Sequence, residues 1–228
     1  MAQETTRPVL YSFRRCPYAM RARLALQVSC QEVELREVVL RDKPAQMIEA
    51  SAKATVPVLV TSSGDVVDES LDVMLWALRR NDPENWLSPQ SGILDEMLAL
   101  IGDNDGPFKT HLDRYKYATR HVDNGDAEAF SNEHRDAALT HLRVLEKRLA
   151  SHPYLFGSRF SLADAAIAPF VRQFANTDRA WFDAQPLPHL QGWLKAFLSS
   201  TAFAGIMRKY PQWRAPEDAV IFPEVEAA

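Results

Sequence analysis

The sequence predicts an α/β domain followed by an all-helical domain. The first 80 or so residues alternate between strand-like and helix-like patterns, whereas no strand pattern recurs beyond residue 92. By the rules for chain connections, the order β-α-β-α-β-β-α gives a mixed four-stranded sheet with helices on its faces. A polar segment rich in Pro, Gly and Ser separates the two parts, which is typical of a linker. We therefore expect domains at residues 1–82 and 93–228, joined by a linker at 83–92.

The elements of the first domain follow from residue type and spacing. Residues 8–12 and 56–60 are short apolar runs of the kind that form buried strands, and residues 32–38 alternate apolar and charged side chains as a half-exposed strand does. Residues 18–27 are rich in Ala, Leu, Met and Arg, which favour a helix. The remaining expected elements are a strand at 66–67 and helices at 45–50 and 70–79.

The second domain shows helical spacing throughout. Two long amphipathic helices are predicted at 93–117 and 128–150, the first of them interrupted by a Gly-Pro pair. Ser161 and Asp164 stand three residues apart at the start of an apolar helix, which is the pattern of a capping box and indicates a structural role. Shorter helices are expected at 165–174, 193–197 and 203–207.

Composition indicates a globular protein without nucleic-acid or membrane partners. The 228 residues are 46% hydrophobic and 25% charged, and the net charge of −4 gives no electrostatic case for nucleic acid. No run approaches the roughly 18 apolar residues of a membrane span, and the N-terminus has no apolar signal region. Two cysteines cannot form a disulfide framework, so we expect a cytoplasmic location. Asp103 opens a segment like a calcium loop, but the later glutamate is absent, so no metal site is expected.

Cys16 lies between the first strand and the first helix. Pro17 suits the first helical position, where its missing N–H costs nothing, so Cys16 is expected to cap the helix. Its sulfur then faces unpaired backbone N–H groups and the positive end of the helix dipole, which lower the pKa of a thiol. We therefore predict a reactive cysteine rather than a buried packing residue. Cys30 has no such surroundings and is expected to be inert.

A second motif position limits the chemistry of this thiol. In a C-x-x-C pair the second cysteine releases the substrate, and here that position holds Ala19. A lone thiolate needs an external thiol to resolve its mixed disulfide. Glutathione is the abundant cytosolic thiol, so we predict a glutathione site beside Cys16.

Four segments of the chain match motifs of one known family. They are LYSFRRCPYAMRARLAL, KATVPVLV, DESLDVMLWAL and FSLADAAIAPFV. In this order they resemble the cytosolic glutathione transferase superfamily, and most of all its omega and related cysteine-type classes. The resemblance implies a thioredoxin-like first domain, glutathione as co-substrate and a homodimer. It also implies a cis Val56–Pro57 bond, whereas the residues alone favour a trans proline that leads into an edge strand.

The resemblance further implies which residues hold glutathione. Glu69 and Ser70 lie where a hairpin enters a helix, and a helix start suits the γ-glutamyl carboxylate because its N–H groups are unpaired. Ser70 can also serve as a helix cap. Val56 would offer its backbone to the cysteinyl part, and Lys43 would approach the glycine carboxylate. The implied glutathione site comprises Tyr18, Lys43, Val56, Pro57, Glu69 and Ser70, with Cys16 as the catalytic residue.

The acceptor substrate is expected to bind between the domains, against the long helix that follows the linker. Phe108 and Tyr115 are seven residues apart and would share one helical face, as ordinary core aromatics also do. The candidate acceptor residues are Phe108, His111, Tyr115 and Trp213.

Tyr11 and Ser12 offer an alternative to the cysteine. Other transferase classes activate glutathione with a hydroxyl near the end of the first strand. Tyr11 comes early for that role, and Ser12 lies in the right neighbourhood. We favour Cys16 because it holds the helix start.

The sequence thus predicts an omega-like glutathione transferase that acts as a glutathione-dependent thiol transferase or reductase. Cys16 would exchange mixed disulfides, and dehydroascorbate reduction or deglutathionylation fits the same site. Two alternatives stay open. One is conjugation of glutathione to electrophiles, and the other is a non-enzymatic interaction protein that keeps the transferase fold.

Overall fold

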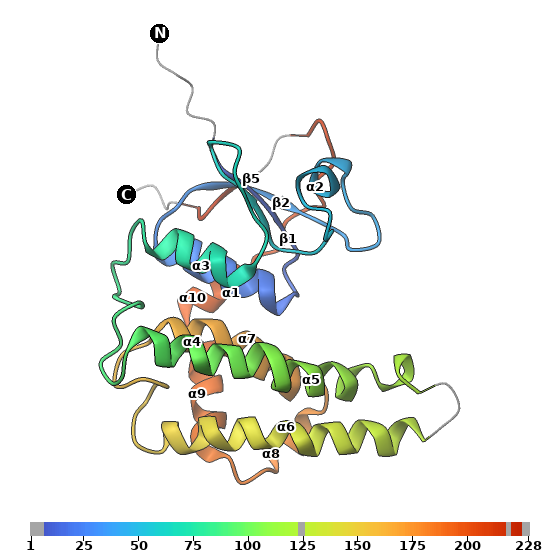
Figure 1. Cartoon of the computed structure of the whole chain (residues 1–228), viewed down its shortest axis with the longest axis vertical. Coiled ribbons are helices and arrows are strands. Elements are labelled where there is room, and N and C mark those ends of the chain that lie inside the picture. Colours follow the sequence, from blue (N-terminus) through green and yellow to red (C-terminus); the bar gives the residue numbers. More distant parts are fainter. Residues whose placement is uncertain (1–6, 123–125, 218–219, 225–228) are drawn as a thin grey trace. The chain divides into compact units, whose positions relative to one another are not determined.

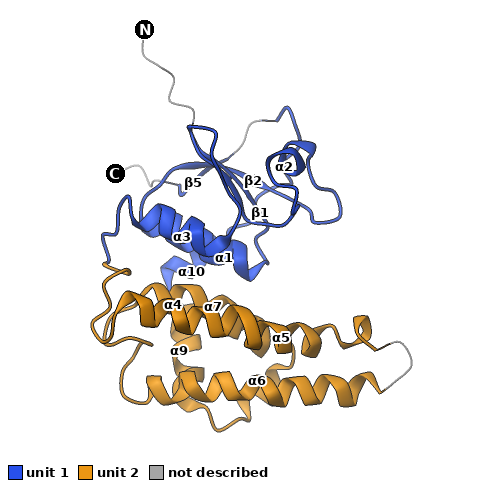
Figure 2. Cartoon of the chain, in the orientation of Figure 1, with its two compact units in different colours: residues 1–84, 199–228 blue, residues 85–198 orange. Residues whose placement is uncertain are grey.

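The computed structural model describes residues 7–122, 126–217 and 220–224. The chain divides into two compact units, shown in Figure 2. The first comprises residues 1–84 together with 199–228, and the second comprises residues 85–198. The C-terminal segment therefore belongs with the sheet, whereas the sequence placed it in the helical domain. Its contacts explain the difference, because it supplies both a strand and a buried tryptophan to the first unit.

The first unit is built on a mixed five-stranded sheet with the strand order β4-β3-β1-β2-β5. Strand β1 is parallel to β2 and antiparallel to β3, so the first three strands form the centre of the sheet. Figure 1 shows helices α1 and α3 together on one side of the sheet and α2 on the other. The elements of this unit are β1 (Val9–Ser12), α1 (Pro17–Val28), β2 (Val33–Glu37), α2 (Ala45–Ala50), β3 (Val58–Val60), β4 (Val66–Val67), α3 (Ser70–Leu78), α10 (Thr201–Ile206) and β5 (Val220–Phe222).

The fifth strand corrects the predicted four-stranded sheet. Strand β5 pairs antiparallel with β2, with Val33 opposite Phe222 and Leu35 opposite Val220. It contains only three residues. A run this short carries no alternating pattern, and it reaches the sheet only because the chain returns from the second unit. The α/β class and the helical second unit are otherwise as predicted.

A buried ion pair ties the sheet to both α1 and α10. The Arg23 side chain is fully buried and donates from Nε to the Ser12 hydroxyl, 2.8 Å away, and from Nη1 to the Ile206 carbonyl, 3.1 Å away. Its Nη2 pairs with the Glu37 carboxylate. Burial lowers the pKa of Arg23, and the attraction of Glu37 opposes that shift. Because each partner comes from a different element, the pair fixes strand ends and helices relative to one another.

All the regular elements among the described residues of the second unit are helices. None of the described helices of the chain combines the length and apolarity needed to cross a bilayer. The single helix expected at 93–117 is divided by a π-helical turn. Pro107 lies inside that turn and has no N–H to donate, so regular α-helical bonding is interrupted there. The elements are α4 (Leu94–Asp103), η1 (Asn104–Phe108), α5 (Lys109–Lys116), η2 (Ala118–Arg120), α6 (Ala127–Leu149), α7 (Leu162–Ala175), α8 (Arg179–Asp183) and α9 (Pro188–Leu198).

The predicted capping box stands at the start of α7. The Asp164 carboxylate is fully buried and accepts from the Ser161 backbone N–H at 3.0 Å and from the Ser161 hydroxyl at 2.7 Å. Its other oxygen accepts from the Leu155 N–H at 3.0 Å and from the Trp193 indole N–H at 2.8 Å. Asp164 is therefore more than a cap, since it joins a loop and α9 to the start of α7.

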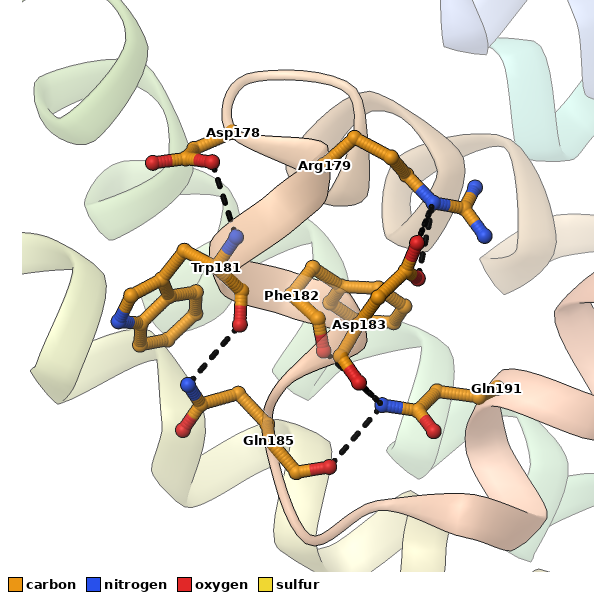
Figure 3. A network of polar contacts seen from close by, with 7 residues as sticks. All are labelled: Asp178, Arg179, Trp181, Phe182, Asp183, Gln185 and Gln191. Carbon is orange, nitrogen blue, oxygen red and sulfur yellow. Dashed lines mark hydrogen bonds and ion pairs between the residues drawn. The ribbon is translucent and has the colours of Figure 1, made fainter.

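The turn from α8 to α9 is held by side-chain amides, shown in Figure 3. Asp178 caps α8 by accepting from the Trp181 N–H at 2.9 Å. Gln191 donates from one amide nitrogen to the carbonyls of Phe182, at 2.9 Å, and Gln185, at 3.0 Å. These bonds pair backbone carbonyls that the end of a short helix leaves open.

We expect Asp164→Asn to destabilise the protein by about 2–4 kcal/mol. In the wild-type protein both carboxylate oxygens accept hydrogen bonds, whereas in the variant the amide NH₂ group replaces one oxygen and faces the same N–H or O–H donors. Urea denaturation of the purified variant measures the change. The matched control is Asp183→Asn, whose ion pair with Arg179 is exposed and should contribute less than about 1 kcal/mol. Equal losses in the two variants would contradict the structural role of Asp164.

Candidate active site

The first unit contains a cavity of about 380 Å³. It is formed by the loop before α1, the loops on either side of α2, and the start of α3. All the residues that the sequence assigned to catalysis and glutathione binding line it together. The lining residues are Cys16, Tyr18, Leu40, Lys43, Ala54, Thr55, Val56, Pro57, Asp68, Glu69 and Ser70.

Cys16 is the N-cap residue of α1, as predicted, and Pro17 follows it at the first helical position. Its backbone N–H donates to the Phe13 carbonyl at 2.9 Å, and its carbonyl accepts from the Met20 N–H at 2.9 Å. The backbone of Cys16 is thus fixed by the turn before the helix and by the first helical bond. Cys16 lines the cavity at the start of α1, the end of a helix dipole that stabilises a negative charge.

Val56 lies next to this sulfur. The distance from the Cys16 Sγ to the Val56 carbonyl oxygen is 3.8 Å. The Val56–Pro57 bond is cis, as the resemblance implies and against the trans bond that the residues alone favour. Ala54, two residues earlier, has a φ of +50°, so this segment follows an unusual backbone path along the cavity wall.

Acidic groups gather at the start of α3. Asp68 and Glu69 both accept from the Lys53 ammonium, at 3.0 Å and 2.6 Å. The Ser51 hydroxyl donates to the other Asp68 oxygen at 2.6 Å, and this bond, reinforced by Lys53, lowers the pKa of the Asp68 carboxyl. The cavity therefore presents carboxylate oxygens beside the N–H groups of a helix start. Sequence reasoning missed Asp68, although it directly precedes the Glu-Ser motif.

A side chain of α1, Arg21, positions the Ser70 hydroxyl. Its oxygen accepts from the Nε of Arg21 at 2.9 Å. The Arg21 side chain is almost entirely buried, with 2% of its surface exposed, and its guanidinium lies 5.2 Å from the centre of the Tyr18 ring. Arg21 thus contacts two residues of the cavity lining without lining the cavity itself. Its spacing of three from Tyr18 on a helix was the available sequence signal.

Lys43 stands on the loop between β2 and α2. An isolated antiparallel β-bridge between Val39 and Asp42 closes this loop. Lys43, the next residue after the bridge, lines the cavity. The Asp42 carboxylate accepts from Arg214 at 2.8 Å and from Gln212 at 2.9 Å. The C-terminal segment therefore steadies the loop that carries Lys43. Together with the acidic groups of α3, Lys43 gives the cavity charges of both signs.

The Tyr11 and Ser12 hydroxyls are buried and engaged elsewhere. Ser12 is fully buried and its oxygen accepts from Arg23. The Tyr11 hydroxyl accepts from the Arg36 guanidinium at 2.7 Å. Neither residue lines the cavity. Neither Tyr11 nor Ser12 therefore places its hydroxyl beside a thiol that is bound in the cavity.

The acceptor candidates are distributed over both units. Phe108 and His111 line a cavity of about 420 Å³ in the helical unit. The Nδ1 atoms of His111 and His134 lie 2.8 Å apart, so these two imidazoles share a hydrogen bond. Tyr115 is a core residue whose ring packs on Phe174, and burial raises the pKa of its hydroxyl.

Trp213 belongs to the core of the first unit. Only 7% of it is exposed, and it packs in a cluster with Tyr11 and Val56, against which Cys16 also rests. The guanidinium carbon of Arg36 lies 4.2 Å from the centre of the Trp213 ring. Trp213 does not line the cavity that contains Cys16. It supports the cavity from the protein interior, through the core cluster that contains Val56 and contacts Cys16. Among the described residues, no group of three or more His, Cys, Asp or Glu could hold a metal ion.

Two family models match the chain. The glutathione S-transferase N-terminal domain matches residues 10–86, and the glutathione S-transferase C-terminal domain matches residues 111–196. The chain belongs to the glutathione transferase superfamily. This confirms the family resemblance seen in the four sequence segments.

Curated relatives and solved structures agree with this membership. Glutathione S-transferase U28 of Arabidopsis thaliana is 24% identical over 177 residues, covering 76% of this chain and 75% of that protein. The probable cytosolic glutathione S-transferase DHAR1 of Oryza sativa subsp. japonica is 22% identical over 192 residues, covering 82% of each. The glutathione transferase URE2P6 of Phanerochaete chrysosporium, solved in complex with oxidized glutathione, superposes with a TM-score of 0.76 at 15% identity, covering 90% of this chain and 96% of that one. At this identity the structural match establishes the fold.

The lowered pKa of His141 should make the stability of the protein depend on pH. It lines the cavity in the helical unit, stacks on Phe108, and burial lowers its pKa to about 4. Below its ordinary pKa of 6.5 the unfolded chain takes up a proton that the folded protein does not. The free energy of unfolding should therefore fall between pH 6.5 and about pH 4, by up to about 1 kcal/mol per pH unit.

We expect His141→Leu to reduce this fall, because leucine fills the site without titrating. Urea denaturation at several pH values from 7.5 to 4 measures it. The control is His152→Gln, at an exposed position, which should leave the slope unchanged. An unaltered slope in His141→Leu would show that other groups cause the pH dependence.

Proposed function

We propose that this protein is a glutathione-dependent thiol transferase of the cysteine type, with Cys16 as its nucleophile. One observation carries the proposal: Cys16 lines the same cavity as every residue that the family resemblance assigns to glutathione. Cys16 also stands at the start of a twelve-residue helix, and the positive end of a helix dipole in general stabilises a thiolate. Membership of the glutathione transferase superfamily supports glutathione as the co-substrate.

The lining of the cavity suits the three parts of glutathione. The N–H groups and hydroxyl at Ser70 suit the γ-glutamyl carboxylate, while Asp68 and Glu69 suit its ammonium group. The backbone of Val56 suits the cysteinyl peptide, which would bring the thiol toward Cys16. Lys43 suits the glycine carboxylate. A ligand held in this way would have its sulfur near the helix start.

The proposed reaction is a pair of thiol–disulfide exchanges. The Cys16 thiolate attacks the glutathione sulfur of a mixed disulfide, forms a Cys16–glutathione disulfide, and releases the other half as a thiolate. A second glutathione, as its thiolate, attacks the sulfur of the bound glutathione. It yields oxidised glutathione and restores the Cys16 thiolate. The proton lost by the second glutathione balances the one gained by the released thiol.

The second cysteine of the chain cannot resolve this disulfide. Cys30 follows the end of α1, whereas Cys16 precedes its start. A helix of twelve residues separates their backbones by about 18 Å, whereas disulfide-bonded Cα atoms lie within roughly 7 Å. An external thiol is therefore required, which is consistent with glutathione as the resolving partner.

The alternatives from sequence are less well supported. Conjugation through a hydroxyl would need Tyr11 or Ser12 in the cavity. The Ser12 hydroxyl instead accepts from the buried Arg23, and the Tyr11 hydroxyl accepts from Arg36, which is partly exposed. A scaffold without activity would not need a cysteine at the helix start facing a cavity with charges of both signs. We further propose a homodimer of omega-like class in the cytoplasm, acting on disulfides, dehydroascorbate or glutathione adducts.

We expect Cys16→Ser to lower glutathione-dependent disulfide exchange at least about a hundredfold, because serine remains protonated and is a poor nucleophile toward disulfides. The measurement is reduction of a glutathione mixed disulfide, coupled to glutathione reductase and NADPH oxidation. The matched control is Cys30→Ser, at an exposed position outside the cavity, which should retain full activity. Undiminished exchange by Cys16→Ser would refute the proposal. Conjugation of 1-chloro-2,4-dinitrobenzene in its place would favour the conjugation alternative.

We expect Lys43→Met to raise the KM for glutathione about three- to tenfold, because the glycine carboxylate loses an ionic partner. For γ-glutamylcysteine, which lacks the glycine, the KM should stay within about twofold. Steady-state kinetics with each thiol as reductant measures both values. Lys195→Met, on the exposed side of α9, serves as the control. Equal rises for the two thiols would show that Lys43 does not contact the glycine end.

A further inference from the structure

Arg21 is buried beneath the cavity and joins two of its walls. It lies on α1, five residues after Cys16, with 2% of its surface exposed. Its Nε donates to the Ser70 hydroxyl oxygen at 2.9 Å, and its guanidinium lies 5.2 Å from the Tyr18 ring centre. Ser70 begins α3 and Tyr18 belongs to α1. Arg21 therefore holds the two helix starts that face the cavity in one arrangement.

This contact determines how the Ser70 hydroxyl can bind a ligand. A hydroxyl carries one hydrogen and two acceptor lone pairs. When a charged N–H donates to the oxygen, the hydroxyl hydrogen turns away and becomes a stronger donor. The Ser70 hydroxyl then favours an acceptor in the cavity and disfavours a second donor such as an ammonium group. Asp68 and Glu69, which precede Ser70, are acceptors and favour the opposite kind of group, as their shared contact with the Lys53 ammonium shows.

We propose that Arg21 is a positioning residue that makes Ser70 a hydrogen-bond donor to the γ-glutamyl carboxylate of glutathione. It thereby separates a carboxylate-binding position at Ser70 from an ammonium-binding position at Asp68 and Glu69. The inference rests on the proposed glutathione site. Arg21 does not line the cavity, so it acts through Ser70 and through the Tyr18 ring on which its guanidinium lies.

Two glutathione analogues separate this role from a general effect on folding. Glutaryl-cysteinylglycine keeps the carboxylate and lacks the ammonium group, whereas 4-aminobutyryl-cysteinylglycine keeps the ammonium group and lacks the carboxylate. Isothermal titration calorimetry gives the Kd of each and of glutathione, and turnover with each thiol is measured separately. The variant is Arg21→Met, which removes the N–H donor and the charge but keeps an apolar stem.

We expect Arg21→Met to weaken glutathione and the glutaryl analogue about tenfold. The 4-aminobutyryl analogue should keep its Kd within about twofold, because it does not use Ser70 as a donor. With glutathione the KM should rise while kcat stays close to the wild-type value. Arg21→Lys, which keeps a charge and an N–H donor, should restore most of the selectivity. Arg36→Met is the control, because Arg36 also lies on aromatic rings but outside the cavity.

Equal weakening of all three ligands would assign Arg21 a merely structural role and overturn the inference, as would unchanged Kd values. Should Arg21→Met not fold, Arg21→Gln replaces it, since it is neutral and keeps an amide donor. Arg21→Gln should lose less affinity than expected for Arg21→Met, and only for the ligands that carry the γ-glutamyl carboxylate. An equal loss of affinity for all three ligands would again overturn the inference. A wild-type protein that binds these thiols without turnover would contradict the proposed function alone.

Discussion

The buried Arg23 side chain is the constraint on which the first unit depends. A guanidinium removed from water must have its charge and its N–H groups matched by the protein, and removing one partner of such a pair is strongly destabilising. Here the partners come from the end of β1, the end of β2 and the end of α10. The loop between β1 and α1, which carries Cys16, is held between these fixed points. The position of Cys16 therefore depends on an interaction that lies outside the cavity that Cys16 lines.

The cavity is built from groups that folding leaves available rather than from a dedicated loop. Helix starts at α1 and α3 supply N–H groups that no helical turn can use, and the chain before β3 supplies the backbone of Val56. Ionisable side chains then divide the cavity, with Asp68 and Glu69 at the start of α3 and Lys43 on the loop before α2. A zwitterionic tripeptide meets complementary charges in a site whose parts are already anchored. Such preorganisation lowers the cost of ordering on binding.

Local sequence predicted those parts of the site that depend on local structure. Cys16 and Ser70 stand at helix starts, and strand, turn and proline patterns locate such positions without any tertiary information. The contribution of Arg21 depends on how α1 packs on α3, which spacing within one helix does not reveal. Strand β5 and the place of Trp213 depend on the chain returning after the whole second unit. The sequence likewise did not reveal that the Tyr11 and Ser12 hydroxyls bind arginines from other elements, because these contacts depend on tertiary packing.

The return of residues 199–228 to the first unit has a consequence for biosynthesis. On the ribosome, the strands β1 to β4 emerge early, but β2 keeps an open edge until β5 has been translated. An open edge is where foreign strands attach. Until then, neither the Ile206 carbonyl nor the Trp213 indole is in place to complete the interior. The helical unit can form during that interval, whereas the thiol-bearing unit is completed only after β5, which follows the whole helical unit in the chain.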